Sequence, residues 1–379
     1  RGLGDVYKRQ NVYKQKYERV CIETFAPVTD EFISNREISI LPFVPHNIDE
    51  RATEILKLQA AGLAGRLKKI NCESVVIGIS GGLDSTLALI VAVEAFNING
   101  YDKKGIHAIT MPCYGTTDRT LNNARRLMEI LEVTSYEINI KDACEQHYKD
   151  IGYDKSKLDV TFENVQARER TQILMDVSNK IGSLVVGTGD LSELALGWCT
   201  YNGDQMSMYG VNASIPKTLV RGILESYAEH HEGLKDVLLD ICDTPVSPEL
   251  LPPNEDGTIK QKTEDKIGSY VVHDFILYYM LRHGFGPKKI FDLYVNAKIM
   301  HEKNIGVKEP VVDKQELLKN MDIFYNRFWT QQFKRSCMPD GVKVGSVSLS
   351  PRGDWRMASD ACQGIWLDEL KDLKEKYCK

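Results

Sequence analysis

Short apolar runs alternate with longer segments of helical length through the middle of the chain. The runs that have the length and composition of buried strands are 75–79, 106–111, 136–140 and 183–187. The segments between them that we predict as helices are 85–97, 118–132 and 163–180. This alternation predicts right-handed crossovers and a parallel sheet covered on both faces. We therefore expect an α/β fold, a doubly wound parallel sheet with helices on both faces, in which ligands bind at the carboxyl ends of the strands.

The pattern differs on either side of this region. Residues 11–50 show no clear period, whereas a helix is predicted from Asp49 by an apolar stripe at Leu56, Ala60, Leu63 and Leu67. After about residue 245 a proline-rich stretch precedes three further predicted helices, at 264–282, 287–301 and 313–332. We expect a helical C-terminal extension that ends in a glycine- and serine-rich tail. The basic residues of that tail suit a lid over an anion, or else a solvated surface loop.

This organisation predicts two parts. Residues 1–48 are an N-terminal remnant and linker, and residues 49–379 form one domain that includes the C-terminal helices and the tail. The first ten residues lack a methionine and any periodicity, so we exclude them from the fold prediction as a scar.

Composition narrows the possible partners and location. The formal net charge of −5 gives no basic field for nucleic acid, and no window approaches the roughly 18 apolar residues of a membrane span. The nine cysteines are scattered and never form a C-x-x-C pair, which is typical of reduced thiols in a cytoplasmic protein. We expect no nucleic-acid partner and no membrane segment.

The stretch VVIGISGGLDST at 75–86 carries the most specific chemistry. Gly81 and Gly82 permit close backbone approach after the strand, and a helix N-terminus then supplies free N–H groups for an anion. Ser80 and Ser85 add hydroxyl donors, and the Asp84 carboxylate can hold Mg²⁺. The stretch is neither a G-x-x-x-x-G-K-[ST] loop nor a G-x-G-x-x-G fingerprint. The alternative is a glycine turn in which Asp84 only caps the helix.

Two later segments add polar and aromatic groups. Asn164 and Arg168 share one helical face in the first, which is also common on surface helices. The second, 185–209, places Thr188 at a strand end and continues with Glu193, which can share a cation with Asp84 or simply face solvent. It also contains groups suited to stack on and orient a ring and its ribose, unless they form a packed turn: Trp198, Thr200, Tyr201 and Asp204.

Together, in this order, these motifs resemble the NAD synthetase family, within the N-type ATP pyrophosphatases and their adenine nucleotide alpha hydrolase-like fold. The resemblance implies ATP, deamido-NAD and ammonia as substrates, Mg²⁺ as cofactor, and an acyl-adenylate intermediate. The implied catalytic residues are Asp84, Lys217 and Glu193, with Asp84 and Glu193 as the metal ligands. The implied ATP-binding residues are Gly78, Ile79, Ser80, Gly81, Gly82, Leu83, Asp84, Ser85, Thr188, Lys217 and Ser247. The implied deamido-NAD-binding residues are Asn164, Arg168, Glu193, Trp198, Cys199, Thr200, Tyr201, Asp204 and Lys334, with Lys343 as the alternative to Lys334.

The resemblance extends to the longer, glutamine-dependent type over roughly residues 30–360. It implies a homo-oligomer and a glutaminase domain that precedes this part in the full-length protein. Other possibilities weighed against it are a GMP synthetase-like ligase, a tRNA thiolase and a non-catalytic adenine-nucleotide sensor. A thiolase would require catalytic cysteines and a basic surface for tRNA, which the scattered cysteines and the net charge disfavour.

Overall fold

Five parallel strands form one sheet in the order β3-β2-β1-β4-β5. The computed structural model describes residues 36–245, 250–252, 263–303 and 311–378. The strands are β1 Val75–Gly78, β2 Ile106–Thr110, β3 Thr134–Glu137, β4 Leu184–Gly187 and β5 Tyr209–Gly210. The strand order reverses between β1 and β4, so the chain segments that leave these two strands lie side by side at one edge.

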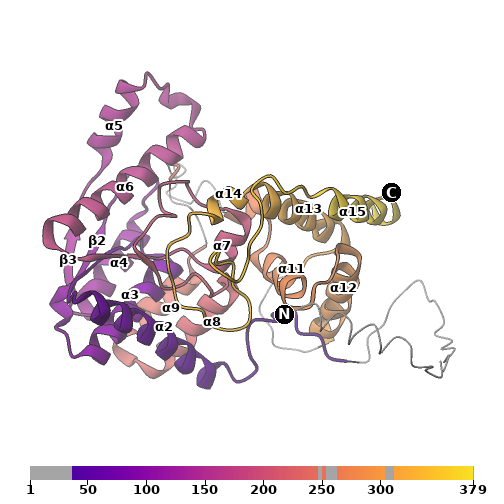
Figure 1. Cartoon of the computed structure of the whole chain (residues 1–379), viewed down its shortest axis with the longest axis horizontal. Helices are drawn as coiled ribbons and strands as arrows, with labels where there is room; N and C mark the ends of the chain where they lie inside the picture. The colour runs from indigo at the N-terminus through magenta and orange to yellow at the C-terminus, as the bar shows by residue number, and fades with distance from the viewer. Residues whose placement is uncertain (1–35, 246–249, 253–262, 304–310, 379) are drawn as a thin grey trace, which may run out of the picture. The chain divides into compact units, whose positions relative to one another are not determined.

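Helices cover both faces of the sheet (Figure 1). The helices around the sheet are α2 Ile48–Ile70, α3 Leu83–Asn99, α4 Asp118–Ile130, α5 Lys141–Asp150, α6 Val160–Ile181, α8 Lys217–His230 and α9 Glu232–Asp243, with short 3₁₀ turns η1 Lys103–Gly105 and η2 Lys155–Lys157. Val75 and Ile77 pack with α2, α3, α4, α8 and α9 on one face, and Val76 packs with α5 and α6 on the other. This alternation along β1 confirms the predicted doubly wound sheet.

The second core is helical. Its elements are α7 Leu191–Leu196, α10 Thr263–Ile267, α11 Tyr270–His283, α12 Pro287–Lys303, α13 Lys314–Thr330, α14 Gln332–Arg335 and α15 Gly364–Tyr377. Helix α7 contacts α11 and α13, and in Figure 1 α7 and α14 lie between the sheet and these helices. Ile38 and Ile40 are buried in the same core, so residues 36–48 belong to one compact unit with residues 49–379.

Most predicted elements are present, with three differences. The third strand was expected at 136–140 but is Thr134–Glu137, because it pairs only as far as Thr110 of β2, after which Asn139 accepts a hydrogen bond from the first residue of α5. The helix expected at 264–282 is interrupted at Gly268, where φ is +87°. Helices α5, α7, α8, α9 and α15 and the two-residue β5 were not predicted. Within the described ranges, no helix has the length and apolarity required to cross a membrane.

Candidate nucleotide-binding site

A cavity of about 720 Å³ opens at the carboxyl ends of β1 and β4. The predicted residues that line it are Gly78, Ile79, Ser80, Gly82, Leu83, Asp84, Ser85, Asn164, Arg168, Thr188, Glu193, Trp198, Cys199, Thr200, Tyr201, Asp204, Lys217 and Lys334. Gly81 belongs to the same loop, and Ser247 lies outside the described residues. Tertiary structure therefore gathers around one space groups that are up to 256 positions apart in sequence, from Gly78 to Lys334.

The loop between β1 and α3 is closed by its own two serines. Ser85 Oγ accepts a hydrogen bond from Ser80 N at 3.3 Å, and Ser80 Oγ accepts one from Gly82 N at 3.2 Å. Gly81 has a φ of +85°, and a Cβ there would lie 2.1 Å from the carbonyl oxygen of Thr120, so only glycine fits. The first N–H groups of α3 have no partner within the helix and face the loop, which makes it suited to bind an anion.

Three carboxylates surround one ammonium group beside this loop. Lys217 Nζ, at the start of α8, lies 2.8 Å from Asp190 and 3.0 Å from Glu193, and it also pairs with Asp84. Asp190 is completely buried and Lys217 nearly so, whereas Asp84 and Glu193 reach the cavity. The four charged side chains carry a formal charge of −2, which a divalent cation can neutralise.

Burial and mutual repulsion shift the ionisation of this cluster. Burial raises the pKa of Glu193 to about 7, with Lys217 opposing and Asp84 adding to the shift. Burial also raises the pKa of Asp190 well above its ordinary value. Burial opposes the charge on Lys217, but the three carboxylates outweigh it and hold the pKa of Lys217 well above its ordinary value. The ammonium ion is thus the stable form of Lys217 in this site.

The donor set fits Mg²⁺. Carboxylate oxygens of Asp84, Asp190 and Glu193 lie within 4.8 Å of one another. Asp84 Oδ1 is buried and has no hydrogen-bond partner in the described part of the chain. Mg²⁺ binds through one or two carboxylates together with substrate phosphates. Asp84 and Glu193, which both face the cavity, are therefore the residues that would hold it.

A polar network between α6 and the loop after α7 forms another part of the cavity wall. Thr200 Oγ1 donates to Asn164 Oδ1 at 2.7 Å, and Thr200 N donates to Asp204 Oδ1 at 2.7 Å. The Arg168 guanidinium donates to the Tyr201 carbonyl oxygen at 3.3 Å. Burial raises the pKa of Asp204. This network orders the loop 197–204 against α6 with its aromatic side chains at the cavity.

The structure separates the two candidate lysines of the tail. Lys334 Nζ lines the cavity and donates to the carbonyl oxygens of Gly197 and Cys199 at 2.8 and 2.7 Å. Lys343 forms an ion pair with Asp354, and it is not among the residues that line the cavity. Arg352 likewise pairs with Asp340 within the tail. The lid role stays a prediction, and Lys334, unlike Lys343, lines the cavity.

Two buried residues that hold this site together were missed from the sequence. Asp190 caps α7 by accepting from Glu193 N at 2.8 Å, and the D-x-x-E spacing is a capping signal that could have identified it. Asn212 is completely buried and donates to the carbonyl oxygens of Asp84 and Thr188 at 2.9 and 3.1 Å. It therefore ties the loop after β1 to the loop after β4, and no local pattern marks it.

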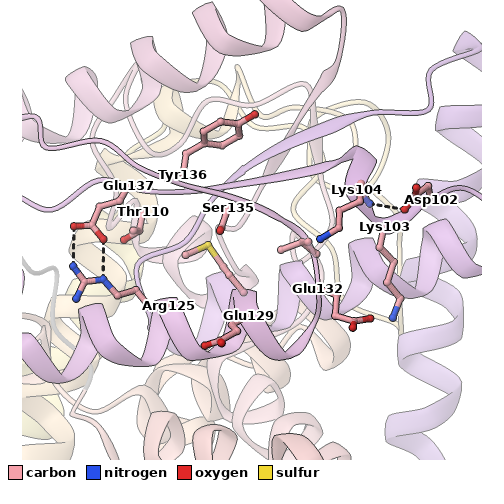
Figure 2. A pocket seen from close by; sticks show the side chains of 12 residues that line it. Asp102, Lys103, Lys104, Thr110, Arg125, Glu129, Glu132, Ser135, Tyr136 and Glu137 are labelled. Carbon is pink, nitrogen blue, oxygen red and sulfur yellow. Dashed lines mark hydrogen bonds and ion pairs between the residues drawn. The ribbon is translucent and has the colours of Figure 1, made fainter.

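A second cavity of about 840 Å³ lies at the β3 edge of the sheet (Figure 2). Figure 2 shows Arg125 of α4 pointing to Glu137 of β3, and these side chains form an ion pair at 2.8 Å. The lining of this cavity also includes Lys103, Lys104 and the acidic side chains of Asp102, Glu129 and Glu132. None of the described residues predicted for the site lines this cavity. The cavity of about 720 Å³ is therefore the one that matches the sequence motifs.

The fold and this site define a class of protein: an α/β protein with a cavity at the switch point of a parallel sheet whose lining is suited to a phosphate-bearing ligand and a divalent cation. A family model described as NAD synthase matches residues 55–302. The chain belongs to the NAD synthase family.

Curated relatives extend this match to most of the chain. The glutamine-dependent NAD(+) synthetase of Mycobacterium leprae (strain TN) is 43% identical over 391 residues, which cover 97% of this chain and 57% of the relative. That of Mycobacterium tuberculosis (strain H37Rv) is 42% identical over 354 residues, which cover 88% and 52%. The chain spans about half the length of the curated relatives it matches.

A solved glutamine-dependent NAD(+) synthetase from Cytophaga hutchinsonii has the same fold. Its TM-score is 0.67 at 18% identity, and the match covers 85% of this chain and 56% of that one. At this identity the likeness supports the fold alone, and it agrees with the doubly wound sheet described above.

Proposed function

We propose that this chain is the synthetase part of a glutamine-dependent NAD synthetase, which amidates deamido-NAD to NAD and converts ATP to AMP and pyrophosphate. One cavity carries this proposal. It is lined by the loop at Ser80–Ser85, by the carboxylates of Asp84 and Glu193, and by a polar wall that includes Asn164 and Tyr201. One end thus offers phosphate and cation chemistry, and the other offers polar and aromatic groups for a second, larger ligand.

The reaction needs activation because a carboxylate repels a nucleophile and has no leaving group. The nicotinate carboxylate attacks the α-phosphorus of ATP, the bond to pyrophosphate breaks, and an acyl-adenylate forms. Ammonia then attacks the acyl carbon, the bond to AMP breaks, and the lost proton goes to solvent. No protein nucleophile takes part, so the chain contributes by positioning and electrostatics.

Each group of the cavity has a role in this scheme. The loop Ser80–Ser85 and the N-terminus of α3 hold the β- and γ-phosphates that leave as pyrophosphate. Asp84 and Glu193 would hold Mg²⁺, and the ion would supply neutralisation of the negative charge on the phosphates. Asn164, Arg168, Thr200, Tyr201 and Asp204 hold deamido-NAD, and Lys334 places a positive charge near its acidic end.

The wider assignment belongs to the same proposal. Ammonia comes from a glutaminase domain of the full-length protein, by analogy with the glutamine-dependent relatives, and the protein works as a homo-oligomer in the cytoplasm. The eight cysteines in the described ranges are all free thiols, in keeping with a reducing compartment.

The decisive experiment mixes the chain with ATP, Mg²⁺, deamido-NAD and either ammonium or glutamine, and measures NAD and AMP. NAD from ammonium but not from glutamine supports the synthetase assignment and a separate ammonia-supplying domain. NAD from glutamine would contradict the second point. Neither NAD nor AMP from either nitrogen source, with a folded chain, would contradict the activity of this part, and Asp84→Asn serves as the inactive control.

A further inference from the structure

Two arginines of the C-terminal helices hold the carbonyl end of α7. Arg327 of α13 donates from Nε to the Leu196 carbonyl oxygen at 2.9 Å and from Nη2 to that of Gly197 at 3.3 Å. Arg335 of α14 donates from Nη1 to the carbonyl oxygens of Leu194 and Ala195 at 3.1 and 2.8 Å. Carbonyls at a helix C-terminus lack partners within the helix and favour cations, so both contacts are expected to stabilise α7.

The two guanidinium groups lie over different aromatic rings. Arg327 stacks over the ring of Trp198 with its Cζ 5.2 Å from the ring centroid, and both side chains line the cavity. Arg335 stacks over Phe328 at 4.5 Å, is completely buried, and is not among the cavity-lining residues. Both arginines thus bond to carbonyl oxygens at the C-terminus of α7, although Arg335 also donates to Gln332 Oε1 and to the Phe328 carbonyl oxygen, and only Arg327 lines the cavity.

We propose that Arg327 is a positioning residue for deamido-NAD, acting through Trp198. This inference rests on the proposed function and deepens it. Arg327 fixes the backbone carbonyls of Leu196 and Gly197 and also lies over the ring of Trp198, the next residue. The orientation of the Trp198 ring is therefore set before the ligand binds.

The planar guanidinium explains why arginine is required. Two N–H groups directed at consecutive carbonyls fix the plane of the guanidinium, and the guanidinium lies over the Trp198 ring. A lysine ammonium can reach one carbonyl or sit over the ring, but it has no plane to align. Lys334 also donates to the Gly197 carbonyl oxygen, so the contact to Leu196 and the stacking on Trp198 are the functions unique to Arg327.

The test compares Arg327→Lys with the matched control Arg335→Lys, using NAD formation from ammonium and calorimetric titration of deamido-NAD and ATP. We expect Arg327→Lys to raise KM and Kd for deamido-NAD about tenfold and to leave KM for ATP within about twofold. Arg335→Lys should lower Tm and leave both KM values within about twofold, since Arg335 bonds to α7, Phe328 and Gln332 in the protein interior and does not line the cavity.

A double-mutant cycle with Trp198→Leu, which removes the aromatic face, separates positioning from structural support. If Arg327 acts through Trp198, the double variant should bind deamido-NAD no more weakly than Trp198→Leu alone. Additive losses, or an Arg327→Lys variant that lowers Tm but keeps KM for deamido-NAD like Arg335→Lys, would overturn the inference. Arg327→Gln, which keeps one donor, replaces Arg327→Lys if that variant does not fold.

Failure of the inference and failure of the proposed function give different results. Wild-type chain that forms NAD, together with unchanged kinetics in Arg327→Lys, contradicts only the role of Arg327. A folded wild-type chain that neither binds deamido-NAD nor forms NAD contradicts the proposed function, and the inference about Arg327 falls with it.

Discussion

Lys217 Nζ lies 2.8 Å from a carboxylate oxygen of Asp190, a side chain with no exposed surface. The pair is not isolated, because Asp84 and Glu193 approach the same ammonium group from the cavity side. A buried charge is costly unless it is paired, so Asp190 is the partner that keeps Lys217 charged and in place from the buried side of the cluster.

Asp190→Asn should impair turnover without unfolding α7. Asparagine caps a helix as well as aspartate does, so the hydrogen bond to Glu193 N is kept while the charge facing Lys217 is lost. We expect kcat to fall about 100-fold through misplacement of Lys217, with Tm changed by only a few degrees. The measurement is NAD formation from ammonium alongside thermal unfolding.

Asp190→Ala is the comparison that tests this reasoning, because it removes the cap as well. It should cost about 1 kcal/mol more in unfolding free energy than Asp190→Asn while giving similar kcat. Wild-type kcat in Asp190→Asn would show that the buried carboxylate does not position Lys217.

Asp84→Asn and Glu193→Gln should abolish the effect of Mg²⁺ on ATP binding. Each removes one carboxylate oxygen from the set that fits the ion, and Asp84 Oδ1 has no other partner in the described residues. We expect Mg²⁺ to tighten ATP binding in the wild type at least about tenfold more than in either variant. Calorimetric titration of ATP with Mg²⁺ and with EDTA measures this, and equal enhancement in all three proteins would rule out these two residues as ligands.

Gly81→Ala should destabilise the loop after β1 more than an ordinary glycine replacement. The new Cβ would meet the Thr120 carbonyl oxygen at 2.1 Å in addition to requiring a φ of +85°. Gly100 is the matched control, because its φ is +69° and nothing lies within 4 Å of a Cβ placed there. We expect Gly100→Ala to cost about 1–2 kcal/mol of unfolding free energy and Gly81→Ala at least about 1 kcal/mol more, measured by urea unfolding. Equal costs would mean that the backbone of Thr120 yields without strain.

His273 and Asp274 should give opposite pH dependences of stability. Burial lowers the pKa of His273 to about 4, so the unfolded state binds more protons between about pH 4 and 6.5 and stability rises with pH in that window. Burial raises the pKa of Asp274 to about 6, so the native state binds more protons between about pH 4 and 6 and the contribution of Asp274 falls as pH rises. In the wild type these two contributions largely cancel.

His273→Gln therefore isolates Asp274. Glutamine keeps a donor for the Ile267 carbonyl oxygen, which His273 Nε2 contacts at 2.6 Å, but does not titrate. Relative to the wild type, the unfolding free energy of this variant should gain up to about 3 kcal/mol at pH 4 compared with pH 7. Asp274→Asn should show the reverse, a steeper loss toward acid. Parallel pH curves for the wild type and both variants would contradict these ionisation states.

The elements around the sheet could be predicted because their signals are local. The strand at Val75–Gly78 and the helices α2, α3, α4 and α6 follow from apolar runs and helical spacing within their own segments. The edge strand β3 is polar, so its register was set by pairing with β2 and was misplaced by the sequence pattern. Helix α7 is only six residues long and depends on contacts with α11 and α13, so periodicity could not reveal it.

The same division holds for the site. The loop at Gly78–Ser85 is a contiguous motif, and its glycine and serine chemistry alone predicted phosphate binding next to a cation. The sequence by itself also determined the parallel sheet, since alternating strands and helices have few other arrangements. The tertiary structure alone decided that Asp190 faces Lys217, that Asn212 joins the two loops, and that Arg327 rather than Arg335 reaches the cavity. These are contacts between segments far apart in sequence, and side-chain packing, which no local pattern encodes, sets which of them meet.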